Sequence, residues 1–256
     1  MSDLINDLKG KKILIAGASS GIGEACAKYL ASCGAIVYIS ARREDELKRV
    51  LSEMEGENHK YYVFDYAQTD KIEGFVKNIV AENGVLDGMV FSVGVTSTRP
   101  LKMIKPEYMQ QIMNVNFFSF LELTRVCTLR NVFNTEKFSM VAVSSISALF
   151  GNQSKTAYAA SKGAIDASVR CIAKEFHSKN IRINAVNPGL VRTAIYDTFV
   201  DNSGDSKDAE DILKRQYMGL IEPMDVAKTV AFLLSDSSKF MTGLSVTLDG
   251  GRVSSS

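Results

Sequence analysis

The sequence predicts an α/β fold built on a doubly wound parallel sheet. Short, nearly continuous apolar runs alternate with longer stretches of helical period up to about residue 190, which is typical of parallel strands joined by helices. A glycine-rich turn, Gly17 to Gly23, directly follows the first apolar run, where this class of fold binds ligands. Strands covered by helices on both faces must be apolar throughout, so we expect helices on both sides of the sheet.

Seven segments are predicted as strands of this sheet. Most of them lack the alternation of apolar and polar residues that a sheet with one solvated face would show. The predicted strands are Lys12–Ala16, Ala35–Ser40, Tyr61–Phe64, Leu86–Ser92, Phe138–Ser144, Ile181–Val186 and Leu244–Leu248.

Several helices between these strands have recognisable ends. Glu24–Cys33 stops at Gly34, a residue that commonly ends helices, and Thr156–Phe176 consists of good helix formers. Pro106 suits the first turn of a helix, and Pro223 suits the start of a last helix that reaches Leu234.

A long polar segment, Val191–Glu222, interrupts the pattern before the last helix. Segments of this length are lids or irregular insertions, and we expect a lid over a substrate site. Substrate specificity would come from this lid and from the turn Gly94–Met103, since loops vary on a shared scaffold. Side chains that could cover an apolar substrate, or equally pack within the lid itself, are Ile195, Tyr196, Phe199, Tyr217 and Met218.

Composition excludes several classes of function. Hydrophobic residues make up 46% of the chain, which argues against disorder, and a net charge of +1 argues against a nucleic-acid partner. Four scattered cysteines and two histidines predict neither a disulfide framework nor a metal site. No signal peptide and no membrane span is visible, so we expect a soluble cytoplasmic protein.

The turn Gly17-Ala18-Ser19-Ser20-Gly21-Ile22-Gly23 predicts a dinucleotide site. Glycines at a strand-to-helix turn let the backbone approach a pyrophosphate, and the helix N-terminus favours its negative charge. Tight packing would explain such glycines as well, but the place of the turn in the first strand–helix unit favours the dinucleotide.

Two arginines follow the second strand, where the adenosine ribose of a dinucleotide would lie. Arg42 and Arg43 stand where an acid would indicate NAD(H), and a guanidinium can bind a 2′-phosphate, so NADP(H) is preferred while NAD(H) stays open. The alternative is that both arginines merely flank the acidic helix start Glu44-Asp45-Glu46.

Tyr158 and Lys162 are four residues apart and share one helix face. A neighbouring ammonium favours the phenolate, which would lower the pKa of the tyrosine towards that of a useful general acid or base. Ser145, just past the strand Phe138–Ser144, could hold a substrate oxygen at the ligand-binding edge, with Ser144 as the competitor.

The ordered set Gly17-x-x-x-Gly21-x-Gly23, Asn116, Ser145, Tyr158-x-x-x-Lys162 and Asn187-Pro188-Gly189 resembles the short-chain dehydrogenase/reductase superfamily over nearly the whole chain. The resemblance implies a Rossmann-like single domain, residues 1–256, with seven parallel strands. It also implies that Tyr158 is the general acid/base and that Ser145, at the family's usual interval, positions the substrate oxygen. Lys162 would also hold the nicotinamide ribose, and Asn116 would support a water-linked proton relay.

The resemblance extends to the cofactor. Asp65 would contact adenine, and the stretch Pro188 to Thr193 would hold the nicotinamide end. The predicted cofactor-binding residues are Gly17, Ser19, Ser20, Gly21, Ile22, Gly23, Arg42, Arg43, Asp65, Tyr66, Gly94, Tyr158, Lys162, Pro188, Gly189, Val191 and Thr193.

Two positions depart from the family pattern. Ala16 stands where threonine is usual, and Ser92-Val93-Gly94 replaces an Asn-Asn-Ala-Gly-like turn. Gly94 still permits close approach of the backbone to the ribose, but hydrogen bonds from the missing side chains must be replaced or lost.

These features predict an NADP(H)-dependent oxidoreductase that transfers a hydride between the nicotinamide and a carbonyl or secondary alcohol. The chain is most similar to the 3-oxoacyl-carrier-protein reductase branch, so the substrate is a free small molecule or carrier-bound. In that branch Lys179 is a counterpart for carrier docking near the mouth of the site, whereas Glu136 stands where another base is expected. Ketosteroid, sugar or polyol oxidation with NAD(H), and a non-catalytic dinucleotide-binding regulator, stay open. The family implies a homo-oligomer, tetramer or dimer.

Overall fold

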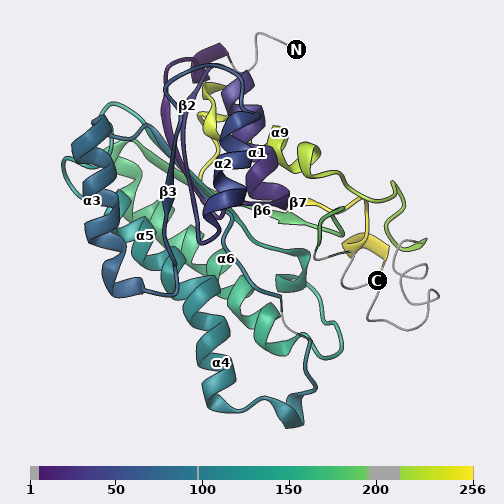
Figure 1. Cartoon of the computed structure of the whole chain (residues 1–256). Helices are drawn as coiled ribbons and strands as arrows, with labels where there is room; N and C mark the ends of the chain where they lie inside the picture. The colour runs from purple at the N-terminus through teal and green to yellow at the C-terminus, as the bar shows by residue number, and fades with distance from the viewer. Residues whose placement is uncertain (1–5, 97, 195, 197–213, 256) are drawn as a thin grey trace.

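The structure is a computed structural model that describes residues 6–96, 98–194, 196 and 214–255. Its centre is a seven-stranded, all-parallel sheet in the order β3-β2-β1-β4-β5-β6-β7, which confirms the predicted fold class (Figure 1). The strands are β1 Lys12–Ala16, β2 Ile36–Ala41, β3 Lys60–Val63, β4 Gly88–Phe91, β5 Phe138–Val143, β6 Ile181–Pro188 and β7 Ser245–Leu248.

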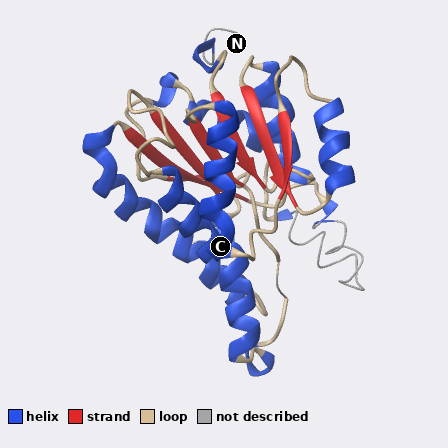
Figure 2. Ribbon diagram, turned by 60° about the vertical axis from the view of Figure 1, so that its left-hand side comes forward, coloured by secondary structure: helices blue, strands red, loops and turns tan. Residues whose placement is uncertain are grey.

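Helices cover both faces of this sheet (Figure 2). On one face α1 packs against α9, and on the other α3 packs against α5, with α6 beside β6. Within β1, Ile13 and Ile15 belong to one core while Leu14 and Ala16 belong to the other, which explains the continuous apolar runs. The principal helices are α1 Gly21–Ser32, α2 Glu44–Ser52, α3 Ile72–Asn83, α4 Pro106–Met113, α5 Ser119–Cys127, α6 Thr156–Phe176 and α9 Pro223–Leu234.

The predicted helix ends are close to those observed. Pro106 and Pro223 both lie in the first turn of their helices, and Glu222 and Asp225 form a capping box at α9. Between α4 and α5 a π-helical segment, Asn114–Phe118, widens the helix for one turn. The hydrophobic periodicity of the sequence gives no sign of this segment. Among the described helices, none is long and apolar enough to cross a membrane.

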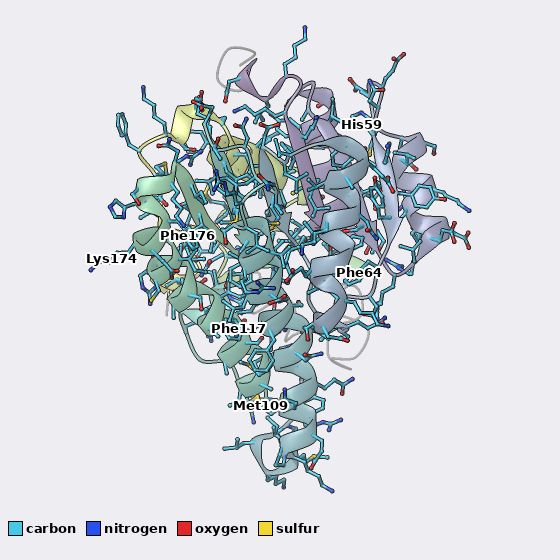
Figure 3. All side chains as sticks on the ribbon, turned by 90° about the vertical axis from the view of Figure 1, so that its left-hand side faces the viewer. His59, Phe64, Met109, Phe117, Lys174 and Phe176 are labelled. Carbon is cyan, nitrogen blue, oxygen red and sulfur yellow. The ribbon has the colours of Figure 1, made fainter. Side chains whose placement is uncertain are left out.

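His59 has a structural role at the edge of the sheet. Its Nδ1 accepts a hydrogen bond from the Val37 amide over 3.0 Å, and its Nε2 lies 2.8 Å from the carbonyl oxygen of Glu55. Both ring nitrogens are therefore used by the backbone around β2 and β3. Figure 3 labels His59.

The order of the strands creates the ligand crevice. β1 pairs with β2 on one side and with β4 on the other, so the order of the strands reverses beside β1. The loops that follow β1 and β4 therefore diverge, and a crevice opens at the carboxyl end of β1. Gly17 lies there with φ +86°, and a Cβ on it would stand 2.8 Å from the Ser92 carbonyl carbon. Only glycine fits this turn.

The space around two glycines predicts opposite effects on stability when each is replaced by alanine. Gly17→Ala combines a left-handed backbone with overlap on Ser92, so we expect the free energy of unfolding to fall by at least about 2 kcal/mol in urea titrations. Gly74→Ala, in α3 with nothing within 4 Å of the added Cβ, should raise it by about 0.5–1 kcal/mol. Equal urea midpoints for Gly17→Ala and the wild type would contradict the packing described.

Candidate active site

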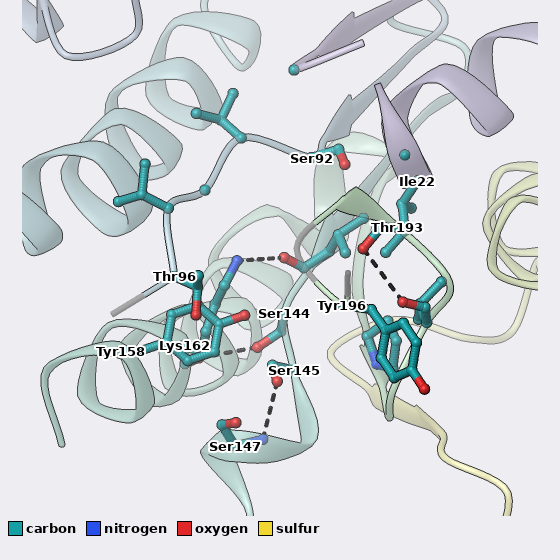
Figure 4. A pocket seen from close by; sticks show the side chains of 18 of the residues that line it. Ile22, Ser92, Thr96, Ser144, Ser145, Ser147, Tyr158, Lys162, Thr193 and Tyr196 are labelled. Carbon is teal, nitrogen blue, oxygen red and sulfur yellow. Dashed lines mark hydrogen bonds between the residues drawn. The ribbon is translucent and has the colours of Figure 1, made fainter. Parts of the chain in front are cut away.

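A cleft of about 1220 Å³ runs along the carboxyl edge of the sheet (Figure 4). The loops after β1, β2, β4, β5 and β6 all contribute to its walls, as the edge of a parallel sheet requires. Every predicted site residue lines this cleft except Gly23 and Asn116. Gly23 packs instead against the Gly17 carbonyl oxygen, which a Cβ on Gly23 would strike. Its role is to bring α1 close to the turn.

The turn after β1 leaves donors for an anion. α1 begins at Gly21, and its N-cap Ser20 makes no side-chain capping bond, so the first backbone N–H groups of the helix are not satisfied by a cap. Gly21 has φ +59°, and an added Cβ would come within 3.2 Å of the Thr193 side chain. The turn therefore fits a pyrophosphate.

Arg43 reaches back across this turn. Its guanidinium donates to the Ser19 hydroxyl over 3.0 Å and to the Ser20 hydroxyl over 2.9 Å. Arg42 is exposed at the rim of the cleft beside Asp65.

The acids that follow the arginines have other partners. Glu44 pairs with Lys48 at 3.0 Å and Glu46 with Arg49 at 2.9 Å. Among the described residues no ion pair links Arg42 or Arg43 to that acidic helix start, so the alternative that they merely flank it gains no support.

Asp65 and Tyr66 lie where the loop after β3 meets the cleft. Asp65 accepts a hydrogen bond from the Ala67 amide over 3.1 Å, which fixes the turn. The Tyr66 hydroxyl lies 2.6 Å from the Ser40 hydroxyl in a buried position, and burial raises its pKa. That hydroxyl is engaged within the protein, so any cofactor contact from Tyr66 would come from another part of the residue.

The two adjacent serines after β5 do different things. The Ser144 hydroxyl is buried and donates to the Lys162 carbonyl oxygen over 3.2 Å. The Ser145 hydroxyl accepts from the Ser147 amide over 3.1 Å and lies close enough to Tyr158 to lower the pKa of that phenol in part. Of the two, Ser145 is the serine placed beside the tyrosine.

The expected effect of Lys162 on Tyr158 is wrong for the structure as it stands. The ammonium lies 5.9 Å from the centre of the Tyr158 ring and donates over 2.9 Å to the Val143 carbonyl oxygen. Desolvation outweighs the help from Ser145, so the pKa of Tyr158 is raised above 10.0. The spacing of four residues brings the side chains to one face, but it does not bring the ammonium to the phenol oxygen.

Lys162 is held as a buried cation. Its side chain is 4% exposed, and burial lowers its pKa to about 8 although Asp166 opposes the shift. Burial also raises the pKa of Asp166, which accepts from the Asn187 amide over 2.6 Å and has one carboxylate oxygen without a hydrogen-bond partner. Gly94 makes room for the ammonium, because a Cβ there would lie 3.3 Å from Lys162 Nζ.

Asn116 lies in the π-helical segment, and its buried side chain binds the loop that carries Gly94 and Val95. Its Oδ1 accepts from the Val95 amide over 2.8 Å, and its Nδ2 donates to the Val95 carbonyl oxygen and to Ser161, over 3.1 and 3.0 Å. The side chain ties the loop after β4 to α6. The proton relay predicted for Asn116 stays a prediction.

The expected lid is only partly described. Ile195, Phe199 and residues 197–213 lie outside the described residues. Tyr196 lines the cleft, whereas Tyr217 and Met218 are largely exposed.

Three cationic residues of the cleft went unpredicted: Lys155, Arg215 and Arg252. Lys155 could have been found, because residues three apart on a helix share a face and Tyr158 is three residues on. Arg215 and Arg252 lie far from Tyr158 in the sequence and carry no motif.

Within one chain Lys179 does not lie near the mouth of the cleft, where its suggested docking role would require it. Lys179 follows the C-terminal end of α6, whereas Tyr158 lies in its first turn, and 21 helical residues span about 30 Å. Glu136 directly precedes β5, so both residues lie at the amino edge of the sheet, opposite the cleft. Phe176, at the same end of α6, is labelled in Figure 3.

The comparisons with known proteins agree with this geometry. Residues 17–252 match the family described as Enoyl-(Acyl carrier protein) reductase. The chain is 33% identical over 249 residues to the 3-oxoacyl-[acyl-carrier-protein] reductase FabG of Thermotoga maritima, covering 96% of this chain and 99% of that protein. It is 31% identical to glucose 1-dehydrogenase of Gluconobacter oxydans, covering 94% and 91%. A dehydrogenase/reductase structure from Sinorhizobium meliloti superposes with a TM-score of 0.87 at 29% identity, covering 97% of each chain.

The fold and the cleft thus define an oxidoreductase that acts on carbonyl or alcohol substrates with a nicotinamide dinucleotide. The chain belongs to the short-chain dehydrogenase/reductase family.

The buried charge of Lys162 predicts a gain in stability when it is removed. One pKa unit corresponds to about 1.4 kcal/mol, so we expect Lys162→Met to raise the free energy of unfolding at pH 7 by about 1–3 kcal/mol. The gain should fade between pH 8 and 10.5, because the folded wild type loses its proton there before the unfolded chain does. Denaturant titrations across this range measure it.

Lys174→Met is the matched control, since Lys174 is exposed on the same helix and its removal should change stability by less than about 0.5 kcal/mol. A destabilised Lys162→Met protein at pH 7 would show that the ammonium is net favourable.

Proposed function

We propose that this protein is an NADP(H)-dependent reductase of a small carbonyl compound, with Tyr158 as the proton donor. One observation carries the proposal. The same cleft has an anion-binding turn with two arginines at one end, and Tyr158, Ser145 and Lys162 at the other. A dinucleotide laid along the cleft would reach both ends, and when bound it would supply the hydride.

Tyr158 is suited to give a proton at neutral pH. Because its pKa is raised above 10.0, the phenol keeps its proton and can donate it to a carbonyl oxygen as charge develops there. The Ser145 hydroxyl would hold the same oxygen from the side, which orients the carbonyl towards the phenol. The reverse reaction needs the phenolate, so alcohol oxidation should become faster as the pH rises.

Lys162 would serve both the proton donor and the cofactor. As an ammonium below about pH 8, and once released from the Val143 carbonyl oxygen, it would stabilise the negative charge left on Tyr158 after proton transfer. It could turn from the Val143 carbonyl oxygen to the ribose hydroxyls of the dinucleotide, with Gly94 leaving the space for this movement.

The preference for NADP(H) rests on Arg42 and Arg43. Arg43 is already positioned by the Ser19 and Ser20 hydroxyls, so its guanidinium loses little freedom on binding a phosphate. Arg42 stands at the rim with its charge exposed. A 2′-phosphate between the two would accept charge-assisted hydrogen bonds that NAD(H) cannot offer.

Cofactor titration tests this preference. We expect Arg42→Ala and Arg43→Ala each to weaken NADPH binding by about 10–100-fold, since a hydrogen bond to a charged group is worth about 1.5–3 kcal/mol, with little change for NADH. The exposed Arg130→Ala, outside the cleft, is the matched control. Fluorescence titration with both nucleotides gives the dissociation constants. Binding of NADH as tight as that of NADPH by the wild type would refute the assignment.

Substitution of the tyrosine tests the chemistry. Tyr158→Phe removes one oxygen and should lower kcat by about 10²–10⁴-fold in NADPH-coupled reduction, while NADPH still binds. Tyr61→Phe, whose hydroxyl contacts Glu44 away from the cleft, should keep full activity. If Tyr158→Phe turns over as fast as wild type, another group donates the proton. Binding of NADPH without turnover of any carbonyl compound would favour a non-catalytic regulator.

Reduction of a carrier-bound 3-oxoacyl thioester is a second candidate, supported by the name of the Thermotoga maritima relative. The position of Lys179 gives it no further support within one chain. The segment 191–222 would act as the lid in either case. We propose that copies of the chain associate through α6, the helix that carries Tyr158 and Lys162.

A further inference from the structure

Positive charge is concentrated in the cleft. The described residues that line it include six cations but only one acid, Asp65 at the adenosine end, although the chain as a whole carries a net charge of only +1. The proposed cofactor accounts for Arg42, Arg43 and Lys162. The remaining cations are Lys155, Arg215 and Arg252.

Lys155 lies immediately beside the proton donor. It precedes α6, and its Nζ lies 6.0 Å from the centre of the Tyr158 ring. Two hydroxyls hold it: Nζ donates to Thr98 Oγ1 over 2.7 Å and to Thr96 Oγ1 over 3.2 Å. Both threonines line the cleft, as Tyr158 does, and Figure 4 labels Thr96 and Tyr158. The ammonium is thus anchored in the same part of the cleft as Tyr158.

This ammonium has only neutral partners. In the part of the chain that the structure describes, no carboxylate forms an ion pair with Lys155, and its partners are the two threonine hydroxyls. The side chain is half-buried, and desolvation lowers its pKa. A partly buried cation without a counter-charge costs free energy, which an anionic ligand would offset. The N-terminus of α6 adds positive potential at the same place.

Arg252 extends the positive region along the wall of the cleft. It is 9% exposed, and its guanidinium carbon lies 5.3 Å from the centre of the Phe150 ring, in the loop that begins at Ser145. Burial lowers the pKa of Arg252, and the nearby charge of Arg215 lowers it further, while the carboxylate of Asp249 opposes the shift. Two neighbouring guanidinium groups repel each other, and an anion beside them would add to the compensation that Asp249 gives.

We propose that the substrate of this enzyme carries an anionic group, a carboxylate or a phosphate, a few atoms from its reactive carbonyl, and that Lys155 binds this anion. The inference rests on the proposed function and specifies its substrate. An anion about 3 Å from Lys155 Nζ and a carbonyl oxygen about 3 Å from the Tyr158 hydroxyl fit within one small molecule, such as a 2-, 3- or 4-oxo acid or a phosphorylated ketone. A neutral thioester would leave Lys155 without a counter-charge.

Paired substrates measure the effect of the charge alone. The carboxylate probes are 2-oxobutyrate, acetoacetate and levulinate, each compared with its ethyl ester, and the phosphate probe is dihydroxyacetone phosphate compared with dihydroxyacetone. The three oxo acids place the carboxylate at increasing distance from the carbonyl. We expect kcat/KM of the charged member to exceed that of its neutral partner by tenfold or more in at least one pair, and the pair that shows it distinguishes carboxylate from phosphate.

Variants of Lys155 connect that preference to the residue. Lys155→Gln should lower the charged-to-neutral ratio of kcat/KM by tenfold or more, mainly through KM, and Lys155→Arg should keep most of it. Lys174→Gln removes an equal charge from the exposed part of α6 and should leave the ratio unchanged. A ratio near one in the wild type, or a ratio that Lys155→Gln does not change, overturns the inference.

The failure of this inference differs from the failure of the proposed function. If the esters are reduced with Tyr158-dependent turnover but the charged substrates are not preferred, the inference of an anion site fails and the proposed reductase function stands. If no probe is turned over, calorimetric titration of the NADPH complex with the four charged probes still decides. Binding that becomes tenfold weaker in Lys155→Gln supports the anion site. The inference is overturned if none of the charged probes binds.

Discussion

The molecule depends on how closely three stretches of backbone approach one another at the carboxyl end of β1. Gly17 lies against Ser92 of the loop after β4, and Gly23 lies against the Gly17 carbonyl oxygen, so that α1 begins directly above the sheet. Side chains at either glycine would push the helix or the neighbouring loop away. This approach leaves the N–H groups of α1 facing the crevice, and it sets the distance between the phosphate turn and the loop that carries Gly94.

The same edge of the sheet accommodates charge at a cost to stability. Lys162 is buried with its pKa lowered to about 8, Asp166 has a carboxylate oxygen without a hydrogen-bond partner, and Lys155 is half-buried against hydroxyls. Each of these groups destabilises the folded state relative to a neutral side chain of the same shape. The two lysines line the cleft, where a bound ribose or anion would supply further hydrogen-bond acceptors for their ammonium groups. The central core of apolar strands supplies the stability that offsets these costs.

Much of the fold followed from local sequence patterns, because the physics that fixes it is local or periodic. β1 was predicted to the residue, and the other strands to within two residues at each end, since a strand buried on both faces must be apolar throughout. β4 is the largest difference: Leu86 makes only an isolated bridge to Phe133, and the regular strand begins at Gly88. Hydrophobicity marks the buried run there, but the hydrogen bonds of the neighbouring strand decide where pairing starts.

The site was predictable where spacing along one element determines it, and less so where contacts between elements decide. Gly17, Ser145 and Tyr158 were placed in one cleft by their positions at strand ends and on α6. Helical spacing alone gave the wrong direction for the pKa shift of Tyr158. The Val143 carbonyl oxygen binds the Lys162 ammonium, and burial raises the pKa of the phenol. The bracing by Asn116 depends on a π-helical turn that periodicity does not reveal.

The most direct measurement for the central claim is a crystal structure of the protein with NADPH. The account predicts the pyrophosphate at the start of α1, the 2′-phosphate within hydrogen-bond distance of Arg42 or Arg43, and the nicotinamide beside Tyr158 and Lys162. A dinucleotide bound elsewhere, or bound in this cleft with its 2′-phosphate directed away from both arginines, would contradict it.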